Sequence, residues 1–135
     1  MVREFNIALI GCGNWGKNIA RNLHQMGSLA CIYDSNTKLS EKLSHDYMLP
    51  YFELKKIFDN KNIKAIVIAS PAITHKDLAI EALKNDKDVF IEKPFCLSLH
   101  DAQKLSDLAK NSNRVLMVGH LLNYHNAFIK MKELI

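Results

Sequence analysis

The sequence has few of the residues that build disulfide-bonded or metal-binding proteins. Its 135 residues include only three cysteines, Cys12, Cys31 and Cys96, with no C-x-x-C pair among them. An odd number of cysteines without such a pair predicts neither a disulfide framework nor a zinc ribbon. Reduced cysteines are typical of cytoplasmic proteins, and we expect that location here. The six histidines form no His-x-x-x-His pair, so the sequence predicts no metal site.

Long apolar runs and blocks of like charge are also absent. No stretch approaches the roughly 18 apolar residues of a membrane-spanning helix. The short apolar segment near the N-terminus leads straight into a glycine loop, so we interpret it as a core strand and not as a signal peptide. The net charge of +4 is spread along the whole chain, without the patch that nucleic-acid binding needs. We therefore expect one globular domain over residues 1–135, with neither nucleic acid nor a membrane as partner.

The most informative motif is the loop from Gly11 to Gly16, with the sequence G-C-G-N-W-G. It follows the apolar run 5–10 and precedes Ile19, Leu23 and Met26, which recur at helical spacing. A G-x-G-x-x-G pattern between a strand and a helix is typical of dinucleotide binding. The glycines allow a tight turn and close approach of the backbone to a pyrophosphate at the start of the helix.

A second feature supports this interpretation. Residues 29–33 have the composition of a second strand, and Asp34 follows at its end. An acidic residue about 20 positions beyond the glycine loop accepts hydrogen bonds from the ribose hydroxyls of the adenosine. A 2′-phosphate would meet a like charge there, so Asp34 favours NAD over NADP. Lys38 lies nearby in the sequence and would weaken that preference.

Two other interpretations of the loop remain open. Gly11, Gly16 and Lys17 also satisfy the spacing of a triphosphatase phosphate loop. The next residue is Asn18, however, where that loop needs a serine or threonine hydroxyl to hold magnesium. The loop is also compatible with a plain glycine turn that binds nothing, although that interpretation leaves Asp34 without a role.

Strands and helices alternate along the rest of the chain. Further strands are predicted at 48–52, 65–69, 88–91 and 114–118, and helices are predicted around residues 39–47, 54–58, 74–83, 98–109 and 124–135. Thr74 and Ser98 each have an acidic residue three positions later, which predicts capping boxes. The alternation predicts an α/β fold, a doubly wound parallel sheet of Rossmann type with strand order 3-2-1-4-5-6 and helices on both faces.

Such sheets bind ligands at the carboxyl ends of their strands. Unusual residues follow these strands, namely Ser70, Pro71, Glu92, Lys93, Pro94, Gly119 and His120, and His75 lies at the start of a helix. Lys93 is the candidate catalytic residue, because a lysine beside a nicotinamide can hydrogen-bond a substrate hydroxyl and, where burial or the positive nicotinamide ring lowers its pKa, take or give the proton. On chemistry alone, a solvated lysine, a solvated carboxylate at Glu92 and structural histidines are the commoner explanations. Trp15 either covers the cofactor or packs beneath the loop.

Several motifs together resemble one enzyme family. They are G-C-G-N-W-G-K-N at 11–18, S-P at 70–71 with His75, E-K-P at 92–94 and G-H at 119–120. In this order they are similar to the glucose–fructose oxidoreductase and myo-inositol dehydrogenase family. The segments W-G-K-N and 119–125 look most similar to its UDP-N-acetylated sugar dehydrogenases.

The resemblance implies an NAD-dependent oxidation of a ring hydroxyl on a sugar or nucleotide-sugar. Lys93 would then handle the proton, and His120 would face the substrate. The implied cofactor contacts are Gly11, Gly13, Asn14, Trp15, Gly16, Asp34, Ser70, Pro71, His75 and Glu92. The resemblance also implies a cis peptide bond before Pro94.

Members of this family carry a second domain that completes the substrate pocket. Residues 124–135 resemble the start of the helix that links the two domains, so we expect the second domain to be absent. Weak or no turnover is then expected, and the C-terminal helix would self-associate or take up a second polypeptide. The alternatives are a non-catalytic module that binds nucleotides or docks on a partner, and a truncated remnant of the enzyme.

Overall fold

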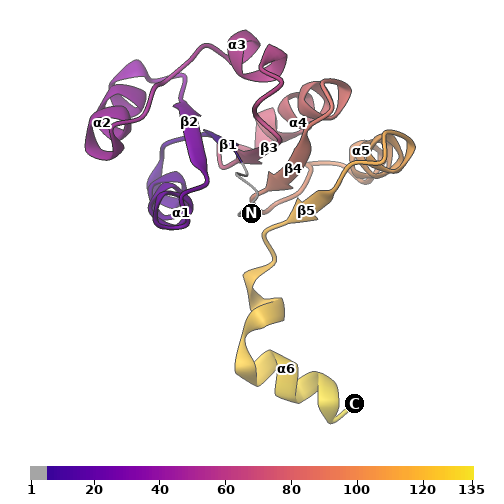
Figure 1. Ribbon diagram of the computed structural model, residues 1–135. Coiled ribbons are helices and arrows are strands. Elements are labelled where there is room, and N and C mark those ends of the chain that lie inside the picture. The colour runs from indigo at the N-terminus through magenta and orange to yellow at the C-terminus, as the bar shows by residue number, and fades with distance from the viewer. Residues whose placement is uncertain (1–5) are drawn as a thin grey trace, which may run out of the picture.

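The computed structural model describes residues 6–135, so residue 5 of the predicted first strand lies outside the described part. One parallel sheet holds five strands in the order β2-β1-β3-β4-β5 (Figure 1). The strands are β1 (Ile7–Ile10), β2 (Leu29–Tyr33), β3 (Ala65–Ile68), β4 (Asp88–Ile91) and β5 (Leu116–Val118). The helices are α1 (Asn14–Gln25), α2 (Thr37–Tyr47), α3 (Leu54–Asp59), α4 (His75–Lys84), α5 (Leu99–Asn111) and α6 (Asn126–Glu133), with 3-10 turns η1 (Ala72–Thr74) and η2 (Leu121–Tyr124).

The strand order confirms the doubly wound fold, but the predicted outer strand at 48–52 is reduced to a single bridge. Only Tyr51 pairs with β2, opposite Ile32. The Ile32 amide donates to the Pro50 carbonyl at 3.2 Å, and the Phe52 amide donates to the Ile32 carbonyl at 3.1 Å. Pro50 has no N–H with which to extend a ladder, and α3 begins at Leu54.

Helices cover both faces of the sheet because neighbouring side chains on a strand point in opposite directions. On β1, Ala8 and Ile10 pack into a cluster that includes residues of α3, α4 and α5. Leu9 lies on the other face, in a cluster with Ala20 of α1 and Leu43 of α2. The central strands therefore consist almost wholly of buried apolar residues, as their sequences predicted.

One of the two predicted capping boxes is wrong. Ser98 does cap α5, since its hydroxyl oxygen accepts a hydrogen bond from the Asp101 amide at 3.1 Å. Thr74 makes no cap, because the turn η1 precedes α4 and redirects its side chain. The Thr74 hydroxyl donates to the Pro71 carbonyl and also lies 2.7 Å from the Ser70 hydroxyl.

The C-terminal segment divides where one helix was predicted. The turn η2 ends at Tyr124, and α6 begins after His125, whose ring nitrogen Nδ1 accepts from the Ala127 amide at 3.2 Å. Helix α6 extends away from the sheet in Figure 1, and none of its residues is buried. Among residues 6–135, no helix is both long enough and apolar enough to cross a membrane.

Candidate functional site

The glycine loop joins β1 to α1 in a conformation that only glycine tolerates at two positions. Gly11 has a φ of +101°, and a Cβ there would lie 2.5 Å from the Ser70 backbone nitrogen. A Cβ on Gly16 would collide with the Gly11 carbonyl. At Gly13, by contrast, nothing lies within 4 Å of a built Cβ. The loop is thus packed closely against the residues that follow β3 on one side and is open at Gly13.

The start of α1 is open to a ligand. Gly13 is the N-cap residue and supplies no capping side chain. The first backbone bond of the helix is donated by the Lys17 amide to the Gly13 carbonyl at 3.0 Å. Free amides and the positive end of the helix dipole at such a terminus favour an anion. Trp15 is 49% exposed beside this terminus, so it does not pack beneath the loop.

Asp34 ties the end of β2 to the glycine loop. One carboxylate oxygen accepts from the Cys12 amide at 2.6 Å, and the other accepts from the Asn36 amide at 2.8 Å. Each carboxylate oxygen keeps a further lone pair for a ligand hydroxyl. Burial and, second, the charge of Asp34 raise the pKa of the Cys12 thiol from 9.0 to about 12. Cys12 is therefore a buried structural residue of the loop.

A cavity of about 210 Å³ lies between the glycine loop, Asp34 and the end of β3. Its lining combines predicted residues with others that the sequence did not single out. The full lining is Ile10, Gly11, Tyr33, Asp34, Ser35, Leu54, Ser70, Pro71, Thr74 and Leu78. Leu54 and Leu78 give it an apolar wall. Their helical spacing predicted only that each helix packs on the sheet, so no signal in the sequence marked them as lining residues.

His75 is buried at the start of α4, with 1% of its surface exposed. Its Nε2 lies 2.8 Å from the Ser70 carbonyl oxygen, and its Nδ1 lies 2.9 Å from the Pro94 carbonyl oxygen. An N–H on either nitrogen donates to the carbonyl that faces it. His75 thus connects the loop after β3 to the loop after β4, and both of its nitrogens face backbone.

The segment Glu92-Lys93-Pro94 follows β4 and contributes side chains in different directions. Glu92 is 6% exposed, and its carboxylate accepts from the Lys93 amide at 3.3 Å. The side chain of Glu92 packs against Gly119, where a Cβ would lie 3.2 Å from Oε1 of Glu92. Lys93 is exposed. The peptide bond between Lys93 and Pro94 is cis, as the resemblance implied.

Lys93 and His120 line the same hollow, which has a volume of about 450 Å³. Gly119, Leu121, Leu122, Asn123 and Phe128 complete its lining. An exposed lysine and an imidazole thus share a largely apolar depression at the carboxyl edge of β4 and β5. Sequence reasoning missed Asn123 and Phe128, since no motif linked them to Lys93.

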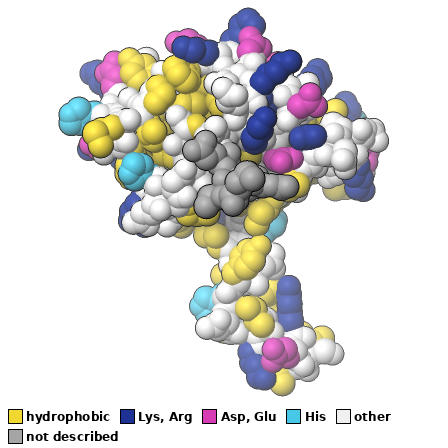
Figure 2. Space-filling model, viewed as in Figure 1, with side chains coloured by type: hydrophobic (Ala, Val, Ile, Leu, Met, Phe, Trp, Pro, Cys, Tyr) yellow, Lys and Arg dark blue, Asp and Glu magenta, His cyan; other side chains and the backbone are white. Residues whose placement is uncertain are grey.

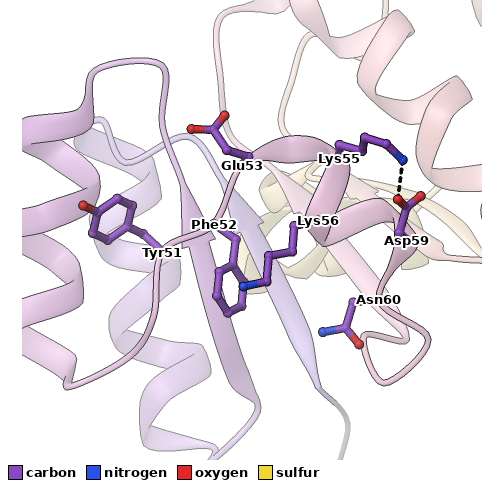
Figure 3. Close-up of a pocket in the computed structure, with 7 residues that line it drawn as sticks. All are labelled: Tyr51, Phe52, Glu53, Lys55, Lys56, Asp59 and Asn60. Carbon is purple, nitrogen blue, oxygen red and sulfur yellow. Dashed lines mark hydrogen bonds and ion pairs between the residues drawn. The ribbon is translucent and has the colours of Figure 1, made fainter.

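A hollow of about 860 Å³ lies along α3 and contains none of the predicted site residues. Figure 3 shows its lining: the ammonium of Lys56 lies 4.0 Å from the centre of the Phe52 ring, and Lys55 is paired with Asp59 at 2.5 Å. Asp59 thus neutralises the charge of Lys55, whereas Lys56 faces an aromatic ring. Within residues 6–135, no group of three or more histidine, cysteine or acidic side chains is placed to hold a metal ion.

Comparison with known proteins supports the dinucleotide interpretation over the triphosphatase one. The model of the oxidoreductase family with an NAD-binding Rossmann fold matches residues 5–120. The 2,7-anhydro-N-acetylneuraminate hydratase of Escherichia coli is 29% identical, over 96% of this chain and 35% of its own. The scyllo-inositol 2-dehydrogenase (NAD(+)) of Bacillus subtilis is 27% identical, over 98% of this chain and 40% of its own.

Solved structures give the same result. GenD2 from gentamicin A biosynthesis, in complex with NAD, has a TM-score of 0.93 at 26% identity, over 99% of this chain and 39% of its own. UDP-N-acetylglucosamine 3-dehydrogenase GnnA from Acidithiobacillus ferrooxidans has a TM-score of 0.88 at 25% identity, over 95% and 42%. The chain thus spans 35% to 42% of the length of these four proteins. It belongs to the oxidoreductase family as an NAD-binding Rossmann domain.

Proposed function

We propose that this NAD-binding domain serves the oxidation of a ring hydroxyl on a sugar, with a nucleotide-sugar as the substrate class. One observation carries the proposal: the open start of α1, Asp34 and Lys93 all follow carboxyl ends of strands in one parallel sheet. Two relatives are named for substrates with ring hydroxyls: scyllo-inositol, which is a cyclic polyol, and UDP-N-acetylglucosamine, which is a nucleotide-sugar. The second name supports the substrate class.

The residues fit NAD, which supplies a hydride acceptor when bound. The uncapped amides at the start of α1 would hold the pyrophosphate. Asp34 would accept from the adenosine ribose hydroxyls with its remaining lone pairs, and the apolar wall of Leu54 and Leu78 suits the flat adenine ring. Glu92 and His75, both buried, would support the nicotinamide end by fixing the backbone around Ser70 and Lys93.

In its neutral amine form, Lys93 would accept a hydrogen bond from the substrate hydroxyl and take its proton to become an ammonium as the hydride leaves the carbon. His120, which lines the same hollow, would contact another hydroxyl of the sugar. We expect turnover by this chain to be weak or absent. The lining of that hollow consists of Lys93 and of residues between 119 and 128, which form a single wall. A single wall holds a substrate poorly in the near-attack geometry that hydride transfer needs.

An NADH titration tests the cofactor site, because Trp15 is the single tryptophan and lies within the glycine loop. We expect saturable quenching, weakened about tenfold or more in Asp34→Ala, which loses hydrogen bonds to a charged acceptor. Asp46→Ala is the control, since it removes one negative charge from an exposed position on α2, away from the glycine loop. Equal affinity in both variants would contradict the role of Asp34.

Turnover is tested with NAD and either UDP-N-acetylglucosamine or myo-inositol. If activity is detected, Lys93→Met should lower the rate by about 100-fold or more while NADH affinity stays within twofold. Lys104→Met, on the exposed side of α5, is the matched control. An unchanged rate in Lys93→Met would exclude the lysine as proton acceptor. Product mass should be followed beside NADH, because the Escherichia coli relative is named a hydratase.

A second candidate is a non-catalytic module that docks on a partner through α6. Met131 on this helix is 47% exposed, Leu134 directly after it is 77% exposed, and Leu122 in the turn before it is 70% exposed. Such a surface would self-associate or bind a second polypeptide. A sedimentation coefficient that increases with protein concentration, and that returns to the monomer value in Leu134→Glu, would support this candidate. A monomer at all concentrations would count against self-association.

A further inference from the structure

The edge of the sheet opposite the glycine loop gathers cations that are scattered in the sequence. Lys64 directly precedes β3, Lys87 directly precedes β4, and Arg114 precedes β5 by two residues. Strands β3 and β4 pair in parallel from their first residues, and the Asp88 amide donates to the Lys64 carbonyl at 3.0 Å. Since all strands run the same way, their amino ends place these three side chains at one edge.

A hollow of about 620 Å³ lies at this edge, between the ends of α3 and α4. Its ten lining residues include five cations, two carboxylates and three uncharged residues: Lys61, Lys64, Lys84, Lys87, Arg114, Asp59, Asp86, Phe58, Ile63 and Asn85. The lining thus carries a net charge of +3, compared with +4 for the whole chain. Figure 2 shows dark-blue Lys and Arg side chains gathered, with magenta carboxylates between them, over the region of α3 and α4.

Lys87 is the most unusual member of this lining. It is 3% exposed, and its ammonium donates to the Asn60 carbonyl at 2.7 Å. Of the carboxylates in residues 6–135, none forms an ion pair with it. Burial and then the neighbouring Lys64 lower the pKa of Lys87, against the opposing charge of Asp86. Buried lysines are rare unless a counter-charge lies beside them.

Stabilisation of helix ends accounts for part of this arrangement. The carboxyl ends of α3 and α4 attract cations, and backbone carbonyls in the turns that follow these helices accept hydrogen bonds from them. The Lys64 ammonium donates to the Lys61 carbonyl at 2.8 Å, and Arg114 donates to the Asp86 carbonyl at 3.5 Å. An ammonium has three N–H donors and a guanidinium has five. These contacts therefore use a minority of the donors and leave the excess positive charge in place.

We propose that this hollow is a second anion site, distinct from the dinucleotide site, and that it binds a chain of two or more phosphate groups. Lysines serve as point-charge ligands of phosphate, and a guanidinium adds a planar fork of donors. Several linked phosphates match a lining whose cations come from three strand ends and two helix ends. A single carboxylate would leave most of this charge unmatched.

The test is a titration of the 15N-labelled full chain with tripolyphosphate, followed amide by amide by NMR, at constant ionic strength and with saturating NADH. NADH occupies the glycine loop, so the two sites report separately. We expect saturable shifts at the amides of residues 61–64 and 84–88. ATP, titrated in parallel, distinguishes free phosphate chains from nucleotides: equal affinity assigns recognition to the phosphates alone, and tighter ATP binding assigns a share to the nucleoside.

Lys64→Gln removes an exposed cation of the lining and should weaken tripolyphosphate binding about tenfold. Lys104→Gln makes the same charge change outside the hollow and should leave binding within twofold. Shifts that never saturate, shifts confined to the glycine loop, or equal losses in both variants would each overturn the proposal. These outcomes do not require turnover, and the amide-by-amide readout separates the hollow from the glycine loop whether or not NADH binds. They therefore do not depend on the proposed enzymatic function.

Discussion

Replacement of His75 by phenylalanine tests how the two site loops are held together. Phenylalanine fills a similar volume but donates no hydrogen bond. In the native structure both ring nitrogens face carbonyls, at 2.8 Å for Ser70 and 2.9 Å for Pro94. A neutral imidazole donates to one of them, and an imidazolium donates to both. The variant therefore loses at least one bond and leaves a partly buried carbonyl unpaired.

The expected cost follows from these contacts. A buried polar group left without its partner costs about 1–3 kcal/mol. Pro94 is exposed, so its carbonyl recovers water, and the Ser70 loop is only half-buried. We therefore expect His75→Phe to lower the free energy of unfolding by about 1–2 kcal/mol. The cost should also appear as weaker NADH binding, since both loops border the proposed site.

Urea denaturation followed by circular dichroism measures the change. The matched control is His45→Phe, because the side chain of His45 is 92% exposed on α2 and should change stability by less than about 0.5 kcal/mol. If His75→Phe changes the free energy of unfolding by no more than the control does, the two carbonyl contacts do not stabilise the fold. If stability falls but NADH affinity matches the control, His75 supports the fold without positioning the site.

Three further outcomes are expected. Gly16→Ala should destabilise the chain and abolish NADH binding, because the added Cβ would collide with the Gly11 carbonyl. A calorimetric titration in which the folded variant binds NADH with native affinity would contradict this prediction. Burial holds the pKa of Cys12 near 12, above its ordinary 9.0, so stability should fall as pH rises above 9.0, where the unfolded thiol ionises first. Burial raises the pKa of Cys31 in the same way, so Cys12→Ala should reduce that slope in urea titrations without abolishing it. Ser98→Ala should cost about 1 kcal/mol of unfolding free energy through loss of the α5 cap, and thermal unfolding beside the exposed control Ser35→Ala measures it.

The fold and the glycine loop were predictable because local chemistry dictates them. Gly11 and Gly16 are required by steric contact over a few residues, and Asp34 lies at a fixed interval beyond them. The role of His75 was not predictable, because it depends on a carbonyl 19 residues away in a loop whose course the sequence does not specify. The outer strand at 48–52 failed for a local reason, since Pro50 interrupts the ladder.

The cationic hollow illustrates a different limit. Each of its lysines looks like an ordinary surface residue in the sequence, and the total charge of +4 appears evenly spread. Only the parallel register of β3, β4 and β5 brings the residues before these strands together. The order of charges along a chain therefore says little about their arrangement on a parallel sheet. Residues that are neighbours at the edge of such a sheet are separated in the sequence by a whole helix.

The double role of Asp34 bears on attempts to change the cofactor preference of this domain. The usual route to NADP replaces the acidic residue at the end of β2 with a small or basic one. Here that carboxylate also accepts from the Cys12 amide and the Asn36 amide. The exchange would remove a repulsive charge and, at the same time, release the loop that must stay rigid for any dinucleotide. A variant library for NADP would therefore have to include side chains at residue 34 that still accept from these two backbone amides.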